Sequence, residues 1–556
     1  MSERIFIGVA WPYANGPLHL GHIAGCYLPA DIFARYHRTK GNQVLMVSGS
    51  DQHGTPITVT AERQGRTPQE VVDESHRSFL DSWDKLGISF DLFTTTGTPN
   101  HAKVVQDIFL RLLERDYLHT NTTPQFYCPK DQRFLPDRYV EGTCPHCGFA
   151  RARGDQCDNC GRPFTSLELA EPRCVFCGTP PEVRDSEHFF LRLSAFNEAL
   201  IAWMKPKTFW RPNVYNFTLR FLGEGLHDRA ITRDIEWGVP IPLDGYDRKR
   251  IYVWFEAVIG YLSASIEWAQ RRGTPDAWEP FWKDADTRSY YFIGKDNIPF
   301  HTIIWPAMIM GYGGLNLPYD VPANEFLNLE GQKLATSRNW AVWVPDYLAR
   351  FDPDPLRYLM SINMPETGDT DFSWREFVRR NNDELVAAYG NLVHRVLTFT
   401  YRNFDQQVPQ SGPLDAADDV MLVRAEQTLG LVGDALERTS FREAIRAAME
   451  LAREANRYLD EKAPWKTLRE DRERTATSLY VALAVINSLK KVLYPFLPFS
   501  SEKLQGLLGL EGSVPAEGWT WEPLAPGRQL QPPQPLFVKL DDDIADEESG
   551  KLGQPT

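Results

Sequence analysis

Positive charge is in short supply in this sequence. Its 60 lysines and arginines are outnumbered by 74 aspartates and glutamates, which gives a formal net charge of −14. This balance argues against a protein that coats DNA or RNA without sequence preference, although a folded RNA can still bind to a local basic face. The first residues also lack a basic segment followed by an apolar run and a cleavage site, so we expect no signal peptide and a cytoplasmic location.

Long hydrophobic runs and the common phosphate-binding motifs are absent as well. The nearly uncharged stretch 297–319 is broken by prolines and glycines and contains His301. It therefore predicts a buried helix and loop, and no membrane partner. No GxxxxGK[ST] loop is present, and no GxGxxG follows a candidate strand. A P-loop ATPase and a dinucleotide-dependent oxidoreductase are not supported.

Cysteine is rare and is concentrated in one region. Seven of the eight cysteines lie between residues 128 and 177, mostly as Cys-x-x-Cys pairs. In a chain without secretory features such pairs are typical of metal sites, with free or disulfide-bonded cysteines as the alternative. One set has the spacing of a closed, structural zinc site: Cys144, Cys147, Cys157 and Cys160. A second, outer set could hold another zinc, with an aspartate in place of a fourth cysteine: Cys128, Asp131, Cys174 and Cys177.

Short apolar runs predict a parallel sheet. The runs IFIGV at 5–9 and VLMVS at 44–48 flank a helical pattern at about 21–38, which is typical of two parallel strands joined by a helix. The run YYFIG at 290–294 is expected to complete the same sheet. The predicted fold class is α/β: a Rossmann-type doubly wound parallel sheet with a zinc-binding insertion and a C-terminal all-α helical bundle domain.

A length of 556 residues exceeds what one hydrophobic core supports, so several domains are expected. Helices are predicted near 67–85 and 101–116 with a polar loop between them, and the pattern is helical after residue 352. The last stretch, DDDIADEESGKLGQPT, is acidic and polar and predicts disorder. The expected divisions are a catalytic domain in two halves, 1–120 and 226–323; an insertion with zinc knuckles, 121–225; a segment carrying KLATS, 324–384; a helical domain, 385–540; and a disordered acidic tail, 541–556.

Polar clusters follow three of the predicted strands. His19 and His22 lie where a helix is predicted to begin, SDQHG stands at 50–54, and GKD stands at 294–296. In a doubly wound sheet ligands bind at the carboxyl ends of the strands, and the unpaired N–H groups of a helix N-terminus favour phosphate. For His19 and His22 alone, a pair of structural histidines is the alternative. Three clusters at one edge of the sheet favour a binding site.

Two segments resemble known signatures. HLGH at 19–22 resembles the HIGH motif of class I aminoacyl-tRNA synthetases, and KLATS at 333–337 resembles their KMSKS motif, in the same order along the chain. The resemblance covers about residues 4–470 and is strongest to the methionyl members of the family. It rests on these segments: WPYANGPLHLGH, SDQHGTPI, FLPDRYVEGTCPHCG, RDSEHFF, YVWFEAVIGY, FIGKDNIPFH and DPDPLRYL. The isoleucyl, valyl, leucyl and cysteinyl members share the two signatures but not this combination with a cysteine-rich insertion.

The resemblance implies a reaction and its partners. In the family the carboxylate of L-methionine attacks the α-phosphate of ATP, which is bound with Mg²⁺, and the methionyl group then passes to the 3′ end of tRNA(Met). Such chemistry depends on positioning and charge stabilisation more than on a nucleophilic side chain. By resemblance the catalytic residues would be His19, His22 and Lys333. The ATP site would comprise His19, His22, Gly294, Asp296, Lys333, Thr336 and Arg338.

The resemblance also implies a methionine pocket, lined by Trp11, Tyr13, Asp51, Trp254, Ala257, Tyr261 and His301. Asp51 would supply a countercharge for the α-ammonium group, and aromatic rings suit a polarizable thioether. Ordinary core packing is the alternative for Trp254 and Tyr261. Trp11 and Val258 stand where the family pattern has Leu and Pro, so we expect a reshaped pocket wall.

A further departure lies in KLATS, where Thr336 replaces the second lysine of the signature. Loss of one preorganised cation next to developing charge costs about 3 kcal/mol in the transition state. We hypothesise that Arg338, two residues further on, supplies part of this charge.

In the helical domain the resemblance implies that Asn391, Arg395 and Trp465 read the CAU anticodon, with Trp465 stacked on an unpaired base. A stripe of arginines on one predicted helix suits phosphate contacts, with an ordinary solvated face as the alternative: Arg442, Arg446, Arg453 and Arg457. Because no appended C-terminal RNA-binding domain is evident, we expect a monomer.

Two other functions stay open on the sequence alone. One is an RNA-binding paralogue that has lost catalysis, which Thr336 favours and His19, His22, Lys333 and Asp51 oppose. The other is a class I synthetase for another small apolar or thiol amino acid.

Overall fold

The centre of the molecule is a five-stranded parallel sheet. The computed structural model describes residues 2–154, 157, 159–160 and 164–554. The strands lie in the order β14-β13-β1-β2-β3, and every neighbouring pair is parallel. Their bounds are Arg4–Val9 (β1), Gln43–Ser50 (β2), Leu92–Thr95 (β3), Arg288–Gly294 (β13) and Ala323–Asn324 (β14). The three strands predicted from the sequence are confirmed.

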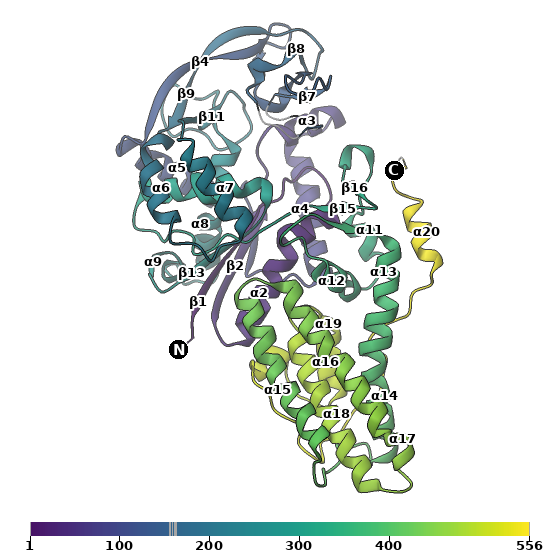
Figure 1. Ribbon diagram of the computed structural model, residues 1–556. Helices are drawn as coiled ribbons and strands as arrows, with labels where there is room; N and C mark the ends of the chain where they lie inside the picture. The colour runs from purple at the N-terminus through teal and green to yellow at the C-terminus, as the bar shows by residue number, and fades with distance from the viewer. Residues whose placement is uncertain (1, 155–156, 158, 161–163, 555–556) are drawn as a thin grey trace.

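Helices cover both faces of this sheet (Figure 1). Tyr290 and Tyr291 are successive residues of β13, so their side chains point to opposite faces. Tyr290 packs against Phe33 of α2 (Leu28–Thr39), and Tyr291 packs against Tyr261 of α8 (Val253–Arg271). The two helices therefore lie on opposite sides of the sheet, which confirms the doubly wound fold.

Two elements beside the sheet differ from the sequence-based expectation. The loop predicted between two helices contains the edge strand β3, and SDQHG leads into an unexpected helix, α3 (Thr55–Gln64). β3 has only four residues, LFTT, which is too short for its alternation to stand out. The flanking helices themselves are confirmed as α4 (Pro68–Leu86) and α5 (Pro99–Glu114).

Between the two halves of the sheet the chain forms an extended arm. β4 (Leu118–Cys128) pairs antiparallel with β9 (Glu182–Leu191), and Figure 1 shows the arm curving away from the sheet toward β7 and β8. At its far end a small buried cluster of twelve described residues includes four cysteines. Such a small core gives little hydrophobic stabilisation, so a bound metal would add substantially to its stability. The short strands here are β5 (Arg133–Phe134), β6 (Val140–Thr143), β7 (Ala152–Arg153) and β8 (Ala170–Cys174).

After the arm the chain returns to the sheet. The elements on the way are α6 (Asn197–Met204), α7 (Pro212–Gly223), β10 (Arg229–Ala230), β11 (Thr232–Arg233), β12 (Arg250–Ile251), α8 and α9 (Glu279–Lys283). β13 is followed by η5 (Lys295–Asn297), η6 (Phe300–Ile304) and α10 (Trp305–Tyr312). The uncharged stretch 297–319 thus folds as short helices and loop, as predicted.

KLATS lies in a small sheet of its own. β15 (Leu327–Leu329) pairs antiparallel with β16 (Gln332–Lys333) and parallel with β17 (Thr370–Phe372). Between β16 and β17 lie η7 (Thr336–Arg338), α11 (Val344–Leu348) and α12 (Pro353–Ile362). Then α13 (Trp374–Arg380), η8 (Asn381–Gly390) and α14 (Asn391–Asn403) follow one another without a break. The boundary expected between 384 and 385 therefore lies inside one continuous helix.

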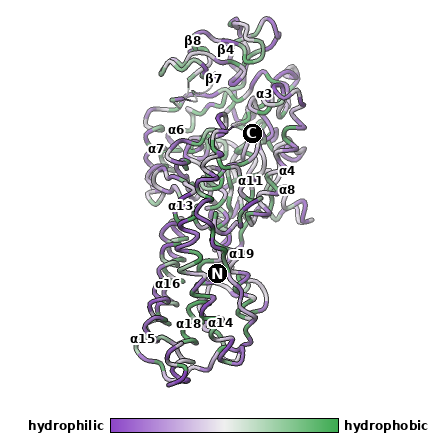
Figure 2. Tube along the Cα trace, turned by 90° about the vertical axis from the view of Figure 1, so that its right-hand side faces the viewer, coloured by the Kyte–Doolittle hydropathy of each residue, from purple (hydrophilic) through white to green (hydrophobic). Residues whose placement is uncertain are grey.

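The helical domain is a bundle of α14 with the long helices α15, α16 and α18 and the shorter α17 and α19, and Figure 1 shows it at the opposite end of the molecule from the arm. The helices after α14 are α15 (Ala416–Glu437), α16 (Phe441–Lys462), α17 (Pro464–Thr467), α18 (Arg472–Leu493) and α19 (Pro498–Leu507). Apolar residues at the three-and-four spacing that is typical of one helix face are buried on α16 and α18: Phe441, Ile445, Ala448, Ala452, Ala455, Leu479, Ala482, Ile486, Leu489 and Leu493. Figure 2 shows hydrophobic and hydrophilic residues alternating along these helices.

α18 is the one helix, within the described ranges, that is long and apolar enough to cross a membrane. However, 94% of this stretch is buried inside the protein. It packs against α15 and α16, as the central helix of a bundle does.

The prediction of a disordered tail at 541–556 is wrong over the described residues. The tail contains α20 (Asp543–Ser549), and the chain is described as far as residue 554, whereas 555–556 lie outside the described residues. Ala545 and Glu548 are buried, and Glu547 pairs with Arg350 at 2.9 Å. The acidic side chains find basic partners on the folded surface, which composition alone does not reveal.

Candidate functional site

His19 and His22 begin the first helix after β1. His19 is the N-cap of α1 (Leu20–His22), and its Nδ1 accepts a hydrogen bond from the backbone N–H of Gly21 at 3.1 Å. The backbone N–H of His19 donates to Nδ1 of His22 at 3.1 Å, and the two rings stack with centroids 3.8 Å apart. This reciprocal capping fixes the orientation of both rings. The chain continues through the π-helical turn η1 (Ile23–Tyr27) into α2.

Both imidazoles are neutral near pH 7. Desolvation, with a contribution from His22, lowers the pKa of His19 well below its usual value, and desolvation lowers the pKa of His22 to about 4. Because each Nδ1 accepts a backbone N–H, the proton of each neutral ring lies on Nε2. The pair therefore offers two N–H donors at a helix N-terminus, an arrangement that suits phosphate oxygens.

The KLATS loop lies directly against the HLGH turn. A Cβ atom added at Gly21 would lie 2.7 Å from Cδ1 of Leu334, so only glycine leaves room for the loop. The backbone N–H of Leu20 donates to the carbonyl of Val342 at 3.1 Å, just beyond the loop. The two signatures, far apart in the sequence, meet in space.

The charged side chains of the loop face solvent. Lys333 ends β16, Thr336 and Arg338 belong to the 3-10 turn η7, and all three are exposed. Two backbone hydrogen bonds of 3.0 Å between Ala335 and Trp340 close the base of the loop. The lysine and the arginine thus stand on a short, anchored turn beside the histidines.

Asp51 lies at the end of β2 and is joined to the loop after β1. Its N–H donates to the carbonyl of Pro12, and its carbonyl accepts from Ala14, both at 2.8 Å. The residue is 4% exposed, and Oδ1 accepts the backbone N–H of His53 at 3.2 Å. Burial raises the pKa of this carboxyl well above its usual value, and the charge of Glu256 raises it further. A ligand ammonium group would supply the missing countercharge.

Aromatic rings lie beside Asp51. Tyr13, bridged to Asp51 through the backbone, meets the ring of Trp254 edge-on with centroids 6.0 Å apart. Trp254 stacks on Phe300 with centroids 4.3 Å apart. The predicted pocket residues Tyr13, Asp51 and Trp254 are therefore brought together.

Tyr261 and His301 form a buried neutral pair. The hydroxyl of Tyr261 lies 2.7 Å from Nε2 of His301, and Nδ1 of His301 lies 3.0 Å from the carbonyl of Asn297. The carbonyl can only accept, so Nδ1 carries the proton and Nε2 accepts from the tyrosine. Burial lowers the pKa of His301 to about 4 and raises that of Tyr261. An uncharged pair suits an uncharged side chain of a ligand.

Trp11 lies in the wall of the predicted methionine pocket, at the position where the family pattern has Leu. Its ring lies between Gly49 of β2 and Gly260 of α8, where added Cβ atoms would lie 2.3 and 2.7 Å from it. The two glycines therefore make room for the large ring. On α8, Ala257 is half-buried and Val258 is buried.

GKD joins the same edge of the sheet. Gly294 ends β13, which pairs with β1, and Asp296 follows on η5. A Cβ atom added at Gly294 would lie 2.8 Å from Oδ1 of Asp296. Burial, and after it the charge of Asp296, raises the pKa of Cys26 on η1. Asp296 thus lies near the turn that follows HLGH.

The four cysteines of the first predicted zinc site converge. Sγ of Cys144 lies 3.9 Å from that of Cys160, and Sγ of Cys147 lies 3.6 Å from that of Cys157. All four sulfur atoms lie within 4.8 Å of one another, and no disulfide forms among them. Zn–S bonds of about 2.3 Å in a tetrahedron require S–S distances of about 3.8 Å. This set could hold one tetrahedral metal ion.

The outer set converges as well. Sγ of Cys128 lies 3.5 Å from that of Cys177, and Sγ of Cys174 lies 3.1 Å from Oδ2 of Asp131. The four ligand atoms also lie within 4.8 Å of one another. Three thiolates and a carboxylate are an acceptable tetrahedral set.

A third group of potential metal ligands is equally close together but differs in chemistry. Glu3, His37 and Glu437 place one ligand atom each within 4.8 Å of the others. Nζ of Lys40 lies 2.5 Å from Glu437, and Nη1 of Arg288 lies 3.5 Å from Glu3. These cations already neutralise the carboxylates, so we assign no metal here.

Two of the predicted anticodon residues lie together on the helical domain. Cζ of Arg395 lies 4.9 Å from the ring centroid of Trp465 on α17. Its Nη atoms lie 3.4 Å from Asp460 and from Asn456. Trp465 is 40% exposed, and Asn391, one turn before Arg395, is also exposed. An exposed ring beside a guanidinium is suited to base stacking.

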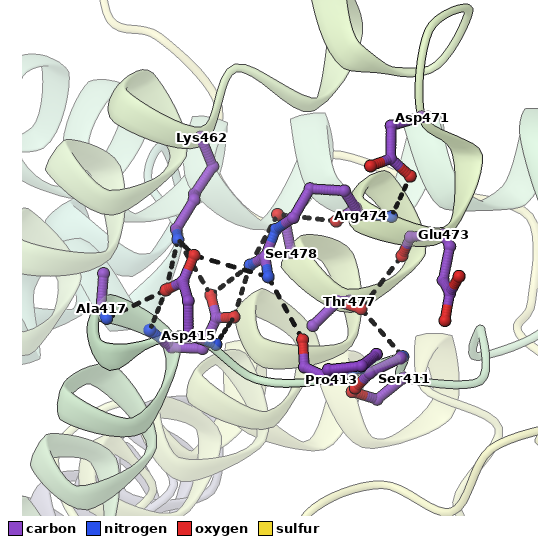
Figure 3. Close-up of polar contacts among 12 residues, drawn as sticks. Ser411, Pro413, Asp415, Ala417, Lys462, Asp471, Glu473, Arg474, Thr477 and Ser478 are labelled. Carbon is purple, nitrogen blue, oxygen red and sulfur yellow. Dashed lines mark hydrogen bonds and ion pairs between the residues drawn. The ribbon is translucent and has the colours of Figure 1, made fainter.

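A network of ion pairs anchors the helices on either side of α17 (Figure 3). Nζ of Lys462, the last residue of α16, lies 2.5 Å from Oδ2 of Asp415. Nη2 of Arg474, on α18, lies 2.5 Å from both carboxylate oxygens of Asp418. The network joins the start of α15 to the end of α16 and the start of α18. The helix that carries Trp465 is therefore held between two anchored ends.

The arginine stripe on α16 is partly paired. Arg453 and Arg457 lie 2.8 and 3.5 Å from Glu450 of the same helix. These pairs are compatible with a solvated face and with a phosphate track, so the role of the stripe stays a prediction.

Two site features were missed from the sequence. Nδ1 of His53 lies 2.6 Å from Oε1 of Glu256, a fully buried residue of α8, and Phe300 stacks on Trp254. Glu256 lies within the apolar run of α8, where a buried charge needs a partner. That need was the signal in the sequence that could have identified the His53–Glu256 pair. Phe300 carries no signal that distinguishes it from a core residue.

The chain matches two family models. The model described as tRNA synthetases class I (M) matches residues 5–397, and the model described as the anticodon binding domain of methionyl tRNA ligase matches residues 408–554. The second match extends through α20.

Curated relatives match over the full length. A methionine–tRNA ligase of Dehalococcoides mccartyi is 61% identical over 553 residues, covering 100% of each chain. One of Thermomicrobium roseum is 56% identical over 580 residues, covering 99% of each. Among solved structures, that of Mycobacterium tuberculosis methionyl-tRNA synthetase in complex with methionyl-adenylate is 27% identical with a TM-score of 0.79, covering 97% of this chain and 100% of that one. The chain therefore belongs to the methionine–tRNA ligase family of class I tRNA synthetases.

Proposed function

We propose that this chain attaches L-methionine to tRNA(Met) at the expense of ATP. A carboxylate oxygen of methionine attacks the α-phosphorus of ATP, and pyrophosphate leaves. A ribose hydroxyl at the tRNA 3′ end then attacks the carbonyl carbon of the methionyl-adenylate, and AMP leaves. The observation that carries the proposal is that HLGH, KLATS and Asp51 lie at one edge of the parallel sheet.

In this proposal the phosphates of ATP lie between the two signatures. His19 and His22 donate from Nε2 to phosphate oxygens without adding a charge, and Lys333 stabilises the leaving pyrophosphate. Gly294 allows the adenosine to approach the end of β13, and Asp296 binds its polar groups. Thr336 contributes a hydroxyl where the family signature has a lysine, and Arg338 contributes the positive charge. Mg²⁺ enters with ATP.

Methionine occupies the pocket beside Asp51. The carboxylate of Asp51 pairs with the α-ammonium group, which favours its ionised form in spite of burial. Tyr13, Trp254 and Ala257 line the space, the Tyr261–His301 pair forms its neutral polar wall, and Trp11 packs behind it. Aromatic rings and neutral polar groups favour a thioether over a charged side chain.

The cysteine sets hold zinc in this proposal, one ion in the inner set and a second in the outer set. Both sites are structural, because all four ligand positions come from the protein. Their contribution is to stabilise an arm that has a small hydrophobic core of its own.

Each domain has its own role in this proposal. Residues 1–120 and 226–323 form the catalytic domain, 121–225 the insertion that contains the arm and its cysteine sets, 324–384 the segment that carries KLATS and contacts the tRNA stem, and 385–540 the helical domain. Asn391, Arg395 and Trp465 contact the anticodon. We propose that the chain acts as a monomer in the cytoplasm; a single copy supplies every proposed site residue.

Exchange of labelled pyrophosphate into ATP tests the first step. We expect rapid exchange with methionine, and at least tenfold lower kcat/KM with homocysteine, leucine or cysteine. Preference for one of the other amino acids would identify a different class I synthetase. No exchange with any of them, together with specific tRNA binding, would identify a paralogue without catalysis. Charging of tRNA(Met) from methionine and ATP tests the second step.

A further inference from the structure

The C-terminal segment, residues 540–554, returns from the helical domain to the catalytic half of the molecule. The N–H of Leu540 donates to Oδ1 of Asn382 at 2.9 Å, and its carbonyl accepts from Nδ2 of the same residue at 2.8 Å. α20 then runs beside α13, and Figure 1 shows the segment up to the last described residues lying near β15 and β16. The segment thus reaches the small sheet that carries KLATS.

It contacts both ends of the KLATS loop. At the upstream end, the hydroxyl of Ser549 donates to Oε1 of Glu330 at 3.3 Å, in the turn between β15 and β16. At the downstream end, the N–H of Gly553 donates to the carbonyl of Asn339 at 3.0 Å, and Nδ2 of Asn339 donates to the carbonyl of Gln554 at 2.7 Å. Lys333, Thr336 and Arg338 lie between these two anchors.

At the downstream anchor, the backbone angle and the side chain of Asn339 are both fixed. Asn339 has φ 50°, in the left-handed region, and its Oδ1 accepts from Nε1 of Trp343 at 2.9 Å. A Cβ atom added at Gly553 would lie 3.5 Å from the ring of Trp340, and Nε1 of Trp340 donates to the carbonyl of Leu329 at 3.0 Å. Gly553 therefore rests on the residue that closes the base of the loop.

Ion pairs hold the segment in place. Arg350 pairs with Glu547 at 2.9 Å and also with Glu548, and Lys551 pairs with Glu548 at 2.7 Å. The side chain of Glu548 is only 11% exposed, so these pairs are partly shielded from water and salt. The acidic composition that predicted disorder instead provides the docking contacts.

We propose that residues 540–554 are a positioning element of the ATP site, which holds the KLATS loop against the HLGH turn by fixing Glu330 and Asn339. This rests on the function proposed above. Loop ends that are already fixed reduce the conformational freedom that is lost when the loop closes on a triphosphate. The contacts of the segment, over the residues that the structure describes, involve neither Asp51 nor Trp465. Its effect is therefore confined to the use of ATP.

Two altered proteins and one control test this. The first ends after Gly550, and the second carries Gly553→Pro, which removes the N–H donor and excludes the observed φ of 74°. The control, Arg375→Ala, removes an exposed ion pair with Asp546 of α20 (3.6 Å) at a distance from the loop. In single-turnover adenylate formation we expect both alterations to raise the apparent Kd for ATP about tenfold. The constant for methionine, and both constants of the control, should equal those of the parent.

Limited trypsin digestion gives a readout that does not depend on activity. Cleavage after Lys333 and Arg338 should be about tenfold faster in Gly553→Pro than in Arg375→Ala, with equal thermal midpoints. Parental ATP constants together with parental cleavage rates would overturn the proposal. So would equal rises in the ATP and methionine constants with a lowered midpoint, which would indicate general destabilisation. If the parent itself shows no exchange with methionine, the proposed function fails, and the cleavage rates still decide whether the segment positions the loop.

Discussion

At the scale of single residues, the candidate site is built from ionisable groups that burial pushes toward their neutral forms. Burial lowers the pKa of His19, His22 and His301, and it raises that of Asp51. In each case the largest cause is the loss of water around the charged form. The site therefore carries little charge of its own on its walls, and a bound ammonium group would meet its strongest partner in Asp51.

Asp51→Asn keeps the shape of the side chain but removes its charge. We expect kcat/KM for methionine in pyrophosphate exchange to fall up to about 100-fold, because a hydrogen bond to a charged group contributes about 1.5–3 kcal/mol. In the parent, kcat/KM for methionine should fall as the pH decreases through the raised pKa of Asp51, since the protonated carboxyl has no countercharge to offer. The variant should lack this acid limb, and a variant with the parental pH profile would contradict the role.

Although Asp51→Asn should lower activity, it should raise the stability of the folded protein at neutral pH. The pKa of Asp51 is raised in the folded protein, so the folded state binds the proton more tightly than the unfolded state does. Its contribution to stability is therefore greatest at low pH and is lost as the pH rises through the folded-state pKa. At pH 7 the Asn variant should unfold at a higher temperature than the parent in calorimetry, and a lower midpoint would contradict this.

Arg338 lies two residues after Thr336, which stands where the family signature has a lysine. Arg338→Ala should lower the rate of exchange about 100-fold, because one preorganised cation contributes about 3 kcal/mol to a transition state with developing charge. Adding Thr336→Lys to that variant should restore most of the rate. An unchanged rate in Arg338→Ala would show that this arginine has no such role.

At the scale of elements, the sequence predicted what periodicity encodes. The central strands and the faces of α16 and α18 follow from apolar patterns, whereas the N-caps Thr67 and Thr98 explain why α4 and α5 begin where they do. β3 is too short to show a pattern, and α20 is stabilised by Arg350, which is distant in sequence. Of the candidate site, the polar clusters could be predicted, but not the His53–Glu256 pair, which depends on how α8 packs against β2.

The arm that carries the two cysteine sets has only a small buried core. Cys144→Ser should lower the bound zinc, measured by atomic emission, by one ion per chain. Structural zinc contributes about 10–16 kcal/mol to small modules, so its loss should also expose the arm between β4 and β9 to proteases. Cys26→Ser, which lies outside both cysteine sets, serves as the control for metal content. An unchanged zinc content in Cys144→Ser would contradict the inner site.

The ion network of Figure 3 makes the start of α15 sensitive to acid. Burial raises the pKa of Asp418, but the hydrogen bonds from Arg474 and its other partners outweigh burial and lower it to about 2. A carboxyl with a lowered pKa stabilises the folded state above its unfolded-state pKa of about 4, and this stabilisation is lost as the pH falls toward 2. Below about pH 4, thermal unfolding of the bundle, followed by its helical signal, should therefore begin at a lower temperature than at neutral pH.

Substitution of Arg474, the cationic partner of Asp418, tests the same network. Arg474→Met leaves the buried Asp418 with fewer cationic partners, and loss of one partner of a buried pair costs about 3–5 kcal/mol. We expect denaturant unfolding followed by circular dichroism to show this loss at pH 7. Arg457→Met, an exposed arginine of α16, is the matched control and should change stability by less than about 0.5 kcal/mol. Equal effects of the two substitutions would show that the network adds no particular stability.

At the scale of the whole molecule, two features join the catalytic half to the helical domain. One is the continuous helix of α13, η8 and α14, which begins beside the KLATS sheet and carries Asn391 and Arg395. The other is the fully buried Arg357, whose Nη2 lies 2.7 Å from Asp31 of α2 and whose Nε donates to the carbonyl of Phe496 at 2.8 Å. Both limit independent movement of the two halves, so a tRNA bound at the anticodon end would present its 3′ end to a site at a fixed position.

Trp465→Ala should impair charging of tRNA without impairing adenylate formation. The ring is exposed beside Arg395 and far along the chain from every proposed ATP and methionine contact, so pyrophosphate exchange should keep its parental rate. Stacking of one base on an aromatic ring contributes about 1–3 kcal/mol, so kcat/KM for tRNA(Met) in charging should fall about 10- to 100-fold. Trp465→Phe keeps a ring and should retain most of the activity. A fall in exchange equal to the fall in charging would mean that Trp465 supports the fold of the bundle and does not read the anticodon.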